Sequence, residues 1–161
     1  MSSSNLKELE NKIGYFFKNR SILKEATTHS SLRTTNPTIK YFERLEFLGD
    51  TVVQMAITEY LFKSMDGANE GTLSIKRAKL VGRSKQTEIA NQLQLSRYIN
   101  KSPGVQENFK RYDQFLEAII GSVYADTGFG GEGLDAAKLF VYKLWKLQPT
   151  NTNVETNCIV M

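Results

Sequence analysis

The most informative part of the chain is residues 41–62, which read YFERLEFLGDTVVQMAITEYLF. This run contains no proline, its only glycine is Gly49, and apolar residues fall on most faces of a helix drawn through it. The pattern therefore predicts a long helix that is largely buried rather than one that lies on the surface.

Three carboxylates interrupt the first half of this apolar run, at Glu43, Glu46 and Asp50. Their spacings of three and four residues place them on one side of a helix, where like charges repel. Burying them unpaired would cost on the order of several kcal/mol each, so we expect a nearby cation. A divalent metal is the simplest choice, because hard cations prefer clustered oxygen ligands. The alternatives are a solvated acidic stripe and ion pairs with Arg44 or other basic side chains.

The composition is that of one soluble globular domain, with 161 residues, 40% apolar and 24% charged. A formal net charge of +4 is compatible with a nucleic-acid partner. The single cysteine, Cys158, excludes an internal disulfide, and no apolar run has the length of a transmembrane helix. The first ten residues lack the apolar core of a signal peptide. We therefore expect an intracellular protein, cytoplasmic or nuclear.

Helical periodicity recurs along the rest of the chain, and strand-like alternation is scarce. An all-α domain over residues 1–147 is therefore predicted, followed by a polar and disordered tail at 148–161. Thr72 is the expected N-cap of the helices that follow the long one. Besides 41–62, the expected helical segments are 6–17, 19–32, 72–99 (two or more helices), 109–126 and 134–147.

A second informative stretch is residues 109–126, FKRYDQFLEAIIGSVYAD, which is apolar nearly all round and contains Glu117. The small residues Ala118, Gly121 and Ser122 would let another helix approach closely. A carboxylate within so apolar a helix needs a partner or a function.

A stripe of basic residues lies between these two stretches. Lys76, Lys79 and Arg83 are spaced by three and four residues, so they share one side of a helical segment. Such a stripe is either a solvated face or a surface that binds phosphates, which supply affinity without reading sequence.

ERLEFLGD, at residues 43–50, resembles the signature of the ribonuclease III family, which are metal-dependent endonucleases of double-stranded RNA. The similarity extends over roughly residues 5–147 and includes THSS at 28–31. It implies the ribonuclease III endonuclease domain fold without the RNA-binding domain that family members often add. It also implies hydrolysis of double-stranded RNA with Mg²⁺, for which Mn²⁺ can substitute, leaving 5′-phosphate and 3′-hydroxyl ends.

The resemblance implies that Glu46, Asp50 and Glu117 are catalytic metal ligands. The family's second acidic motif is Asp-x-x-Glu, and Gln114 stands at its aspartate position here. The carbonyl of Gln114 can coordinate a metal but brings no charge. The neighbouring Asp113 would replace it if a π-type turn brought Asp113 round toward Glu117.

Further residues match family positions that lie around the substrate. Lys110 matches a lysine near the scissile phosphate, although a solvated lysine at a helix start is an equal alternative. Glu43 and Glu70 match acidic positions at the cleft between subunits, where they would tune substrate placement. Phe47 matches a residue that inserts into the partner of a symmetric homodimer, or it belongs to the core.

Two more positions depart from the family, at Phe42, where a polar Asn or His is usual, and at residues 80–83, LVGR instead of LVS and a following Asn. The final residues 158–161, CIVM, fit a prenylation motif at Cys158. No polybasic segment precedes it, and one lipid gives only marginal membrane binding.

Three functions follow from these observations. The first is a homodimeric endoribonuclease, helped by a separate RNA-binding partner. The second is a catalytically impaired protein of the same fold that binds double-stranded RNA or acts as a scaffold, which Gln114 would explain. The third is a metal-binding helical domain with no RNA role.

Overall fold

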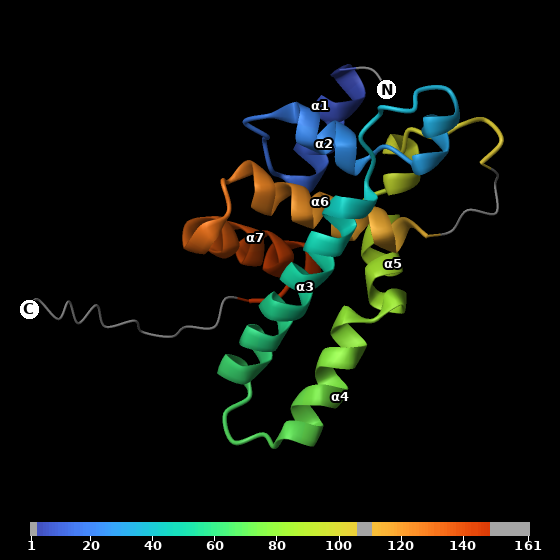
Figure 1. Ribbon diagram of the computed structural model, residues 1–161. Helices are drawn as coiled ribbons and strands as arrows, with labels where there is room; N and C mark the ends of the chain where they lie inside the picture. The colour runs from blue at the N-terminus through green and yellow to red at the C-terminus, as the bar shows by residue number, and fades with distance from the viewer. Residues whose placement is uncertain (1–2, 106–110, 149–161) are drawn as a thin grey trace, which may run out of the picture.

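The computed structural model describes residues 3–105 and 111–148. Within these ranges all the regular secondary-structure elements are helices (Figure 1). The all-α prediction is therefore confirmed. Lys110, Cys158 and nearly all of the expected tail lie outside the described residues. The helices are α1 (Ser3–Ile13), α2 (Arg20–Ala26), η1 (Ser30–Thr34), α3 (Glu43–Ser64), α4 (Glu70–Val81), α5 (Arg83–Gln92), η2 (Leu95–Tyr98), α6 (Tyr112–Asp126) and α7 (Gly130–Trp145).

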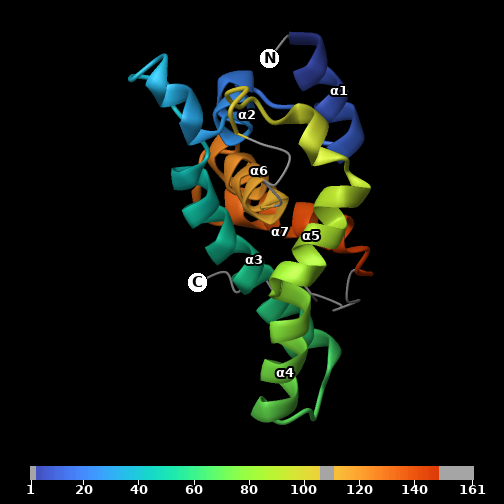
Figure 2. The same ribbon diagram turned by 90° about the vertical axis from the view of Figure 1, so that its right-hand side faces the viewer.

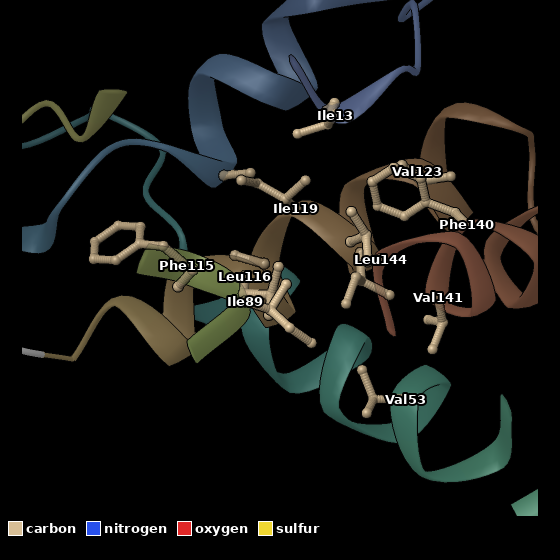
Figure 3. Packing of buried hydrophobic residues seen from close by; sticks show 14 of the residues in the cluster. Ile13, Val53, Ile89, Phe115, Leu116, Ile119, Val123, Phe140, Val141 and Leu144 are labelled. Atoms are coloured by element: carbon tan, nitrogen blue, oxygen red, sulfur yellow. The ribbon is translucent and has the colours of Figure 1, made fainter. Parts of the chain in front are cut away.

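Helix α6 is the centre of the molecule, because it contacts α2, α3, α5 and α7 (Figures 1 and 2). Most of its apolar side chains are fully buried and meet side chains from the surrounding helices in one core (Figure 3). The all-round apolar pattern of this segment is thus explained by its central position. The core residues labelled in Figure 3 are Ile13, Val53, Ile89, Phe115, Leu116, Ile119, Val123, Phe140, Val141 and Leu144.

Helices α3 and α6 cross in backbone contact at two glycines. A Cβ atom added to Gly49 would lie 1.8 Å from the carbonyl oxygen of Glu117. A Cβ atom added to Gly121 would lie 2.1 Å from the carbonyl oxygen of Leu45. No side chain fits at either position, so the crossing requires glycine on both helices. The crossing faces the acidic half of α3 toward the first half of α6.

The far half of α3 and helix α4 lie side by side and extend together from the rest of the molecule (Figures 1 and 2). Gly82 separates α4 from α5, and a Cβ added there would lie 2.7 Å from the carbonyl oxygen of Ala78. The indole Nε1 of Trp145 donates to the carbonyl oxygen of Leu80 at 2.8 Å and fixes the end of α4. The departure from the family pattern at residues 80–83 therefore falls at a helix break.

Several expected boundaries are wrong. The predicted helix over 6–17 ends at Ile13 and is followed by Gly14, which has a φ of +67°. The predicted helix over 19–32 ends at Ala26, because the hydroxyls of Thr27 and Thr28 bond back to carbonyls of α2 and the backbone then pairs with Asn100. The N-cap of α4 is Asn69 rather than Thr72, whose amide donates to the Asn69 side chain at 2.9 Å. Helix α7 begins four residues early, at Gly130.

Within residues 3–105 and 111–148, no helix is both long and apolar enough to span a membrane.

Candidate active site

The α3–α6 crossing brings Glu46 and Gln114 into direct contact. The Gln114 side chain donates from Nε2 to Oε1 of Glu46 at 2.7 Å. Gln114 lies in the first turn of α6 and Glu46 in the first turn of α3, so residues 68 positions apart meet at the start of both helices. The residue at the family's aspartate position therefore does face the signature helix, but as a hydrogen-bond donor.

Glu117, one turn further along α6, is held by Gln86 of α5. The Nε2 atom of Gln86 donates to Oε1 of Glu117 at 2.7 Å and to the carbonyl oxygen of Val81 at 2.9 Å. Gln86 is only 3% exposed, and its Oε1 atom is buried with no hydrogen-bond partner in the described part of the chain. Sequence reasoning missed Gln86, although a polar residue three and four positions before the buried Ile89 and Ala90 was a signal.

Burial and repulsion raise the pKa of two carboxylates in this region, Glu46 and Glu117. The pKa of Glu117 is raised to about 7, mainly by burial and also by the negative charges of Asp50, Glu46 and Asp113, while the hydrogen bond from Gln86 lowers it in part. Burial also raises the pKa of Glu46, while its bond to Gln114 opposes the change. Asp50, on the same helix as Glu46, is exposed to solvent. The arrangement therefore gathers acidic groups that lack a full set of positive partners.

The π-type turn that would let Asp113 replace the missing aspartate ligand does not occur in α6. Helix α6 is a regular α-helix from Tyr112 to Asp126, without the π-type turn that would bring Asp113 round. The Asp113 carboxylate instead accepts from Nε and Nη2 of Arg111, at 3.2 and 3.1 Å, and lies 3.7 Å from Nε of Arg83. Two guanidinium groups thus occupy this carboxylate.

Arg111 is the second residue that sequence reasoning missed. It is the N-cap residue of α6, and its positive charge lowers the pKa of Glu46. The charges of Asp113, Glu46 and Glu117 in turn raise the pKa of Arg111. The basic residue three positions before Gln114 was visible in the sequence. The direction of its side chain, however, depends on the residue at which α6 starts.

The remaining predicted residues divide between this site and other surfaces. Glu43 is exposed in the first turn of α3, and its charge raises the pKa of Glu46. Arg83 of the basic stripe lies beside Asp113, whereas Lys76 and Lys79 are exposed on α4. Glu70 begins α4 at the end that lies away from α6, where it accepts from Ser74 at 2.7 Å (Figure 1).

Two phenylalanines, one just before the signature and one within it, have opposite environments. Phe42 is 4% exposed and stacks on Phe115 with ring centroids 4.3 Å apart, which explains an apolar residue at that departure from the family. Phe47 is 80% exposed, so the alternative that it belongs to the core is wrong. It borders a groove of about 640 Å³ that Tyr41, Leu48 and Phe129 also line.

The donor atoms of this site suit a divalent cation, but the side chains are not arranged around one. Among residues 3–105 and 111–148, no group of three or more His, Cys, Asp or Glu side chains is arranged to hold a metal ion. Glu46 and Glu117 instead each accept a hydrogen bond from a glutamine amide. The oxygens of Glu46, Glu117 and Asp50 are nevertheless the hard donors that Mg²⁺ prefers. Turning the Gln114 amide would add its carbonyl oxygen to them.

Comparisons with known proteins point in one direction. A family model described as ribonuclease-III-like matches residues 19–145. Ribonuclease 3 of Ehrlichia chaffeensis is 40% identical over 148 residues, covering 88% of this chain and 63% of that protein. Ribonuclease 3 of Clostridium beijerinckii is 42% identical over 135 residues, covering 81% of this chain and 58% of that protein. The chain thus spans about three fifths of the length of these relatives.

Among solved structures, the nuclease domain of ribonuclease III from Campylobacter jejuni superposes with a TM-score of 0.78 at 34% identity. The superposition covers 88% of this chain and 96% of the Campylobacter chain. The sequence matches and the shared fold agree, and the α3–α6 crossing with its acidic residues lies inside the matched region. The chain belongs to the ribonuclease III family.

Proposed function

We propose that this protein is an endoribonuclease that cleaves double-stranded RNA by divalent-metal-dependent hydrolysis of phosphodiesters. The observation that carries the proposal is that Glu46 and Glu117 lie on two helices whose backbones are in contact at the α3–α6 crossing, where the charges of Asp50 and Glu46 raise the pKa of Glu117. The names of the relatives in Ehrlichia and Clostridium support the same activity. The products would carry 5′-phosphate and 3′-hydroxyl ends.

Glu46, Asp50 and Glu117 would hold Mg²⁺, or Mn²⁺ in its place, together with the carbonyl oxygen of Gln114. When bound, such an ion polarises the phosphate and makes a water molecule more acidic. The chain's own contribution is to fix the carboxylates, because Gln86 holds Glu117 from α5 and the glycine crossing sets the spacing of α3 and α6. Arg111 adds positive charge at the edge of the site.

Gln114 would weaken the metal site without removing it. A neutral amide in place of a carboxylate lowers the negative charge that attracts a divalent ion, so we expect cleavage to need a higher Mg²⁺ concentration. If that loss abolished catalysis, the protein would act as an RNA-binding or scaffold protein of the same fold. The two outcomes are separated by the assay below.

Double-stranded RNA is recognised mainly by its shape, its phosphates and its 2′-hydroxyls. Lys76 and Lys79 present exposed ammonium groups on α4 that suit phosphate contacts. Because one nuclease domain offers few such contacts, a separate RNA-binding partner would increase affinity.

A homodimer would place two such sites on one RNA duplex. The exposed Phe47 and its groove provide an apolar surface of the kind that self-association covers. The Campylobacter nuclease domain is itself described as having a region involved in dimer formation. Glu43 and Glu70 would then line the cleft between the subunits and tune the placement of the RNA. Glu70 would reach the cleft from the far end of α4.

The test is a cleavage assay on a long RNA duplex with Mg²⁺ or Mn²⁺, run on the wild type, Glu117→Gln and Gln114→Asp. We expect the wild type to cut, Glu117→Gln to be inactive, and Gln114→Asp to cut at a lower Mg²⁺ concentration. Glu132→Gln, which changes an exposed glutamate of α7, is the matched control and should cut normally. Intact RNA with every variant, despite retained RNA binding, would refute cleavage and favour the scaffold function.

A further inference from the structure

Two arginines from different helices share one buried carboxylate at the edge of the acidic site. Arg111 caps α6, Arg83 begins α5, and Asp113 lies in the first turn of α6. The Asp113 side chain is 6% exposed, whereas those of Arg111 and Arg83 are 42% and 61% exposed. The carboxylate is therefore inside, and both guanidinium groups reach solvent from it.

This cluster has more positive charge and more hydrogen-bond donors than its carboxylate can use. Two guanidinium groups and one carboxylate leave a net charge of about +1, and each guanidinium offers five N–H donors. Within the described residues, the hydrogen bonds of Arg111 use only its Nε and Nη2 atoms. Nε of Arg83 approaches Asp113 at 3.7 Å, which is an ion pair rather than a hydrogen bond. Donors on both side chains therefore remain available to a ligand.

The position of the cluster identifies the ligand chemistry. Asp113 precedes Gln114, whose side chain donates to Glu46 at 2.7 Å, so a molecule that contacts both arginines also lies next to the acidic site. An RNA strand that approaches this site meets carboxylates that repel its phosphates. Arginine is the side chain best suited to bind a phosphate through two N–H groups, and an arginine held in place loses less entropy on binding.

We propose that Arg111 and Arg83 together bind one backbone phosphate of the RNA substrate, beside the phosphate that is cleaved, and that Asp113 is a positioning residue for both. The proposal rests on the proposed function, because it needs RNA as the ligand. It gives Asp113 a different role from the metal ligand that the sequence suggested.

A purely structural role makes a different prediction. A carboxylate in the first turn of a helix is stabilised by the helix dipole, and two arginines could simply neutralise it. In that case, removing either arginine would lower the stability of the fold and leave RNA binding no more affected than the loss of a charge elsewhere.

The experiment measures binding of a fluorescein-labelled RNA duplex by anisotropy, in EDTA so that no cleavage occurs, over a series of salt concentrations. Arg111→Gln and Arg83→Gln should each weaken binding about tenfold, the loss expected for a hydrogen bond to a charged group. Each should also reduce the slope of log affinity against log salt by about one. The double variant should be little weaker than either single variant, because both arginines hold one phosphate.

Arg97→Gln is the matched control, since it removes an arginine that is about as exposed as Arg83 and pairs with Glu8 on another part of the surface. Arg111→Lys keeps the charge but loses the planar fork, so it should retain the salt slope and lose part of the affinity. It also serves if Arg111→Gln fails to fold, as thermal unfolding of each variant would reveal.

Asp113→Asn separates positioning from net charge by the sign of its effect. If only charge mattered, removing this carboxylate would tighten RNA binding. If Asp113 positions the arginines, binding should weaken although the protein becomes more positive.

The proposal is overturned if Arg111→Gln and Arg83→Gln bind as Arg97→Gln does, or if Asp113→Asn binds more tightly than the wild type. If the wild type cuts and binds RNA while these variants behave as the control does, only this inference is refuted and the proposed function stands. A wild type that neither binds nor cuts duplex RNA refutes the proposed function, and this inference with it.

Discussion

Replacing Glu117 by glutamine should make the metal-free protein more stable at alkaline pH. Burial, together with neighbouring negative charge, raises the pKa of Glu117 from 4.5 to about 7. Between these two values the folded protein binds more protons than the unfolded chain does, so the free energy of unfolding falls as the pH rises. Above pH 7 the full cost of the charged, part-buried carboxylate is present. Glu117→Gln removes this cost and keeps an oxygen that accepts from Gln86.

The size of the gain follows from the pKa shift. The change from 4.5 to about 7 corresponds to roughly 3 kcal/mol at 1.36 kcal/mol per pKa unit. Because Glu117 is only part-buried, solvent screening reduces this to about 1–2 kcal/mol. We therefore expect Glu117→Gln to be about 1–2 kcal/mol more stable than the wild type at pH 8, and the gain to fall toward zero as the pH is lowered to about 4.5.

Urea unfolding followed by circular dichroism, in EDTA at several pH values, measures this difference. Glu132→Gln is the control, because Glu132 is exposed and its replacement should give the same small effect at every pH. A Glu117→Gln protein that is no more stable than the wild type at pH 8 would refute the reasoning. A gain that does not depend on pH would show that packing rather than charge is responsible.

Three further predictions concern the residues that support the site. Gly121→Ala should lower the free energy of unfolding in urea by about 3 kcal/mol or more, because its Cβ would lie 2.1 Å from the carbonyl oxygen of Leu45 and would force two helices apart. Gly131→Ala, whose Cβ would meet nothing within 4 Å, is the control. Equal effects of the two substitutions would contradict the close contact of α3 and α6. Gln86→Leu should lower the free energy of unfolding by about 1–3 kcal/mol in the same assay, since it leaves Glu117 without its hydrogen-bond donor. An unchanged urea midpoint would contradict this role of Gln86. Phe47→Ala should convert a dimer into a monomer in light scattering without lowering the unfolding temperature of the monomer, and a wild-type monomer would remove the dimer proposal.

The fold could be predicted from the sequence where the signal was local. The apolar run at 41–62 appears as α3, and the small residues around Gly121 do accept a close helix. The second helix was predicted too long because apolar spacing does not reveal that Thr27 and Thr28 bond back to the helix and end it.

The site was less predictable because its contacts join distant parts of the chain. Gln86 meets Glu117 across 31 residues, and its role depends on the helix break at Gly82, which no spacing rule supplies. Asp113 and Gln114 are neighbours in sequence, yet the start of α6 sends one side chain to two arginines and the other to Glu46. The choice between them required the direction of each side chain around the helix axis.

The most direct test of the acidic site is a calorimetric titration of the protein with Mn²⁺ in the absence of RNA. If Glu46, Asp50 and Glu117 bind one divalent ion, Glu117→Gln should weaken Mn²⁺ binding at least about tenfold, and Gln114→Asp should strengthen it because it adds a negative ligand. Equal Mn²⁺ affinities for the wild type and both variants, or binding that Glu117→Gln leaves intact, would contradict a metal site at the α3–α6 crossing.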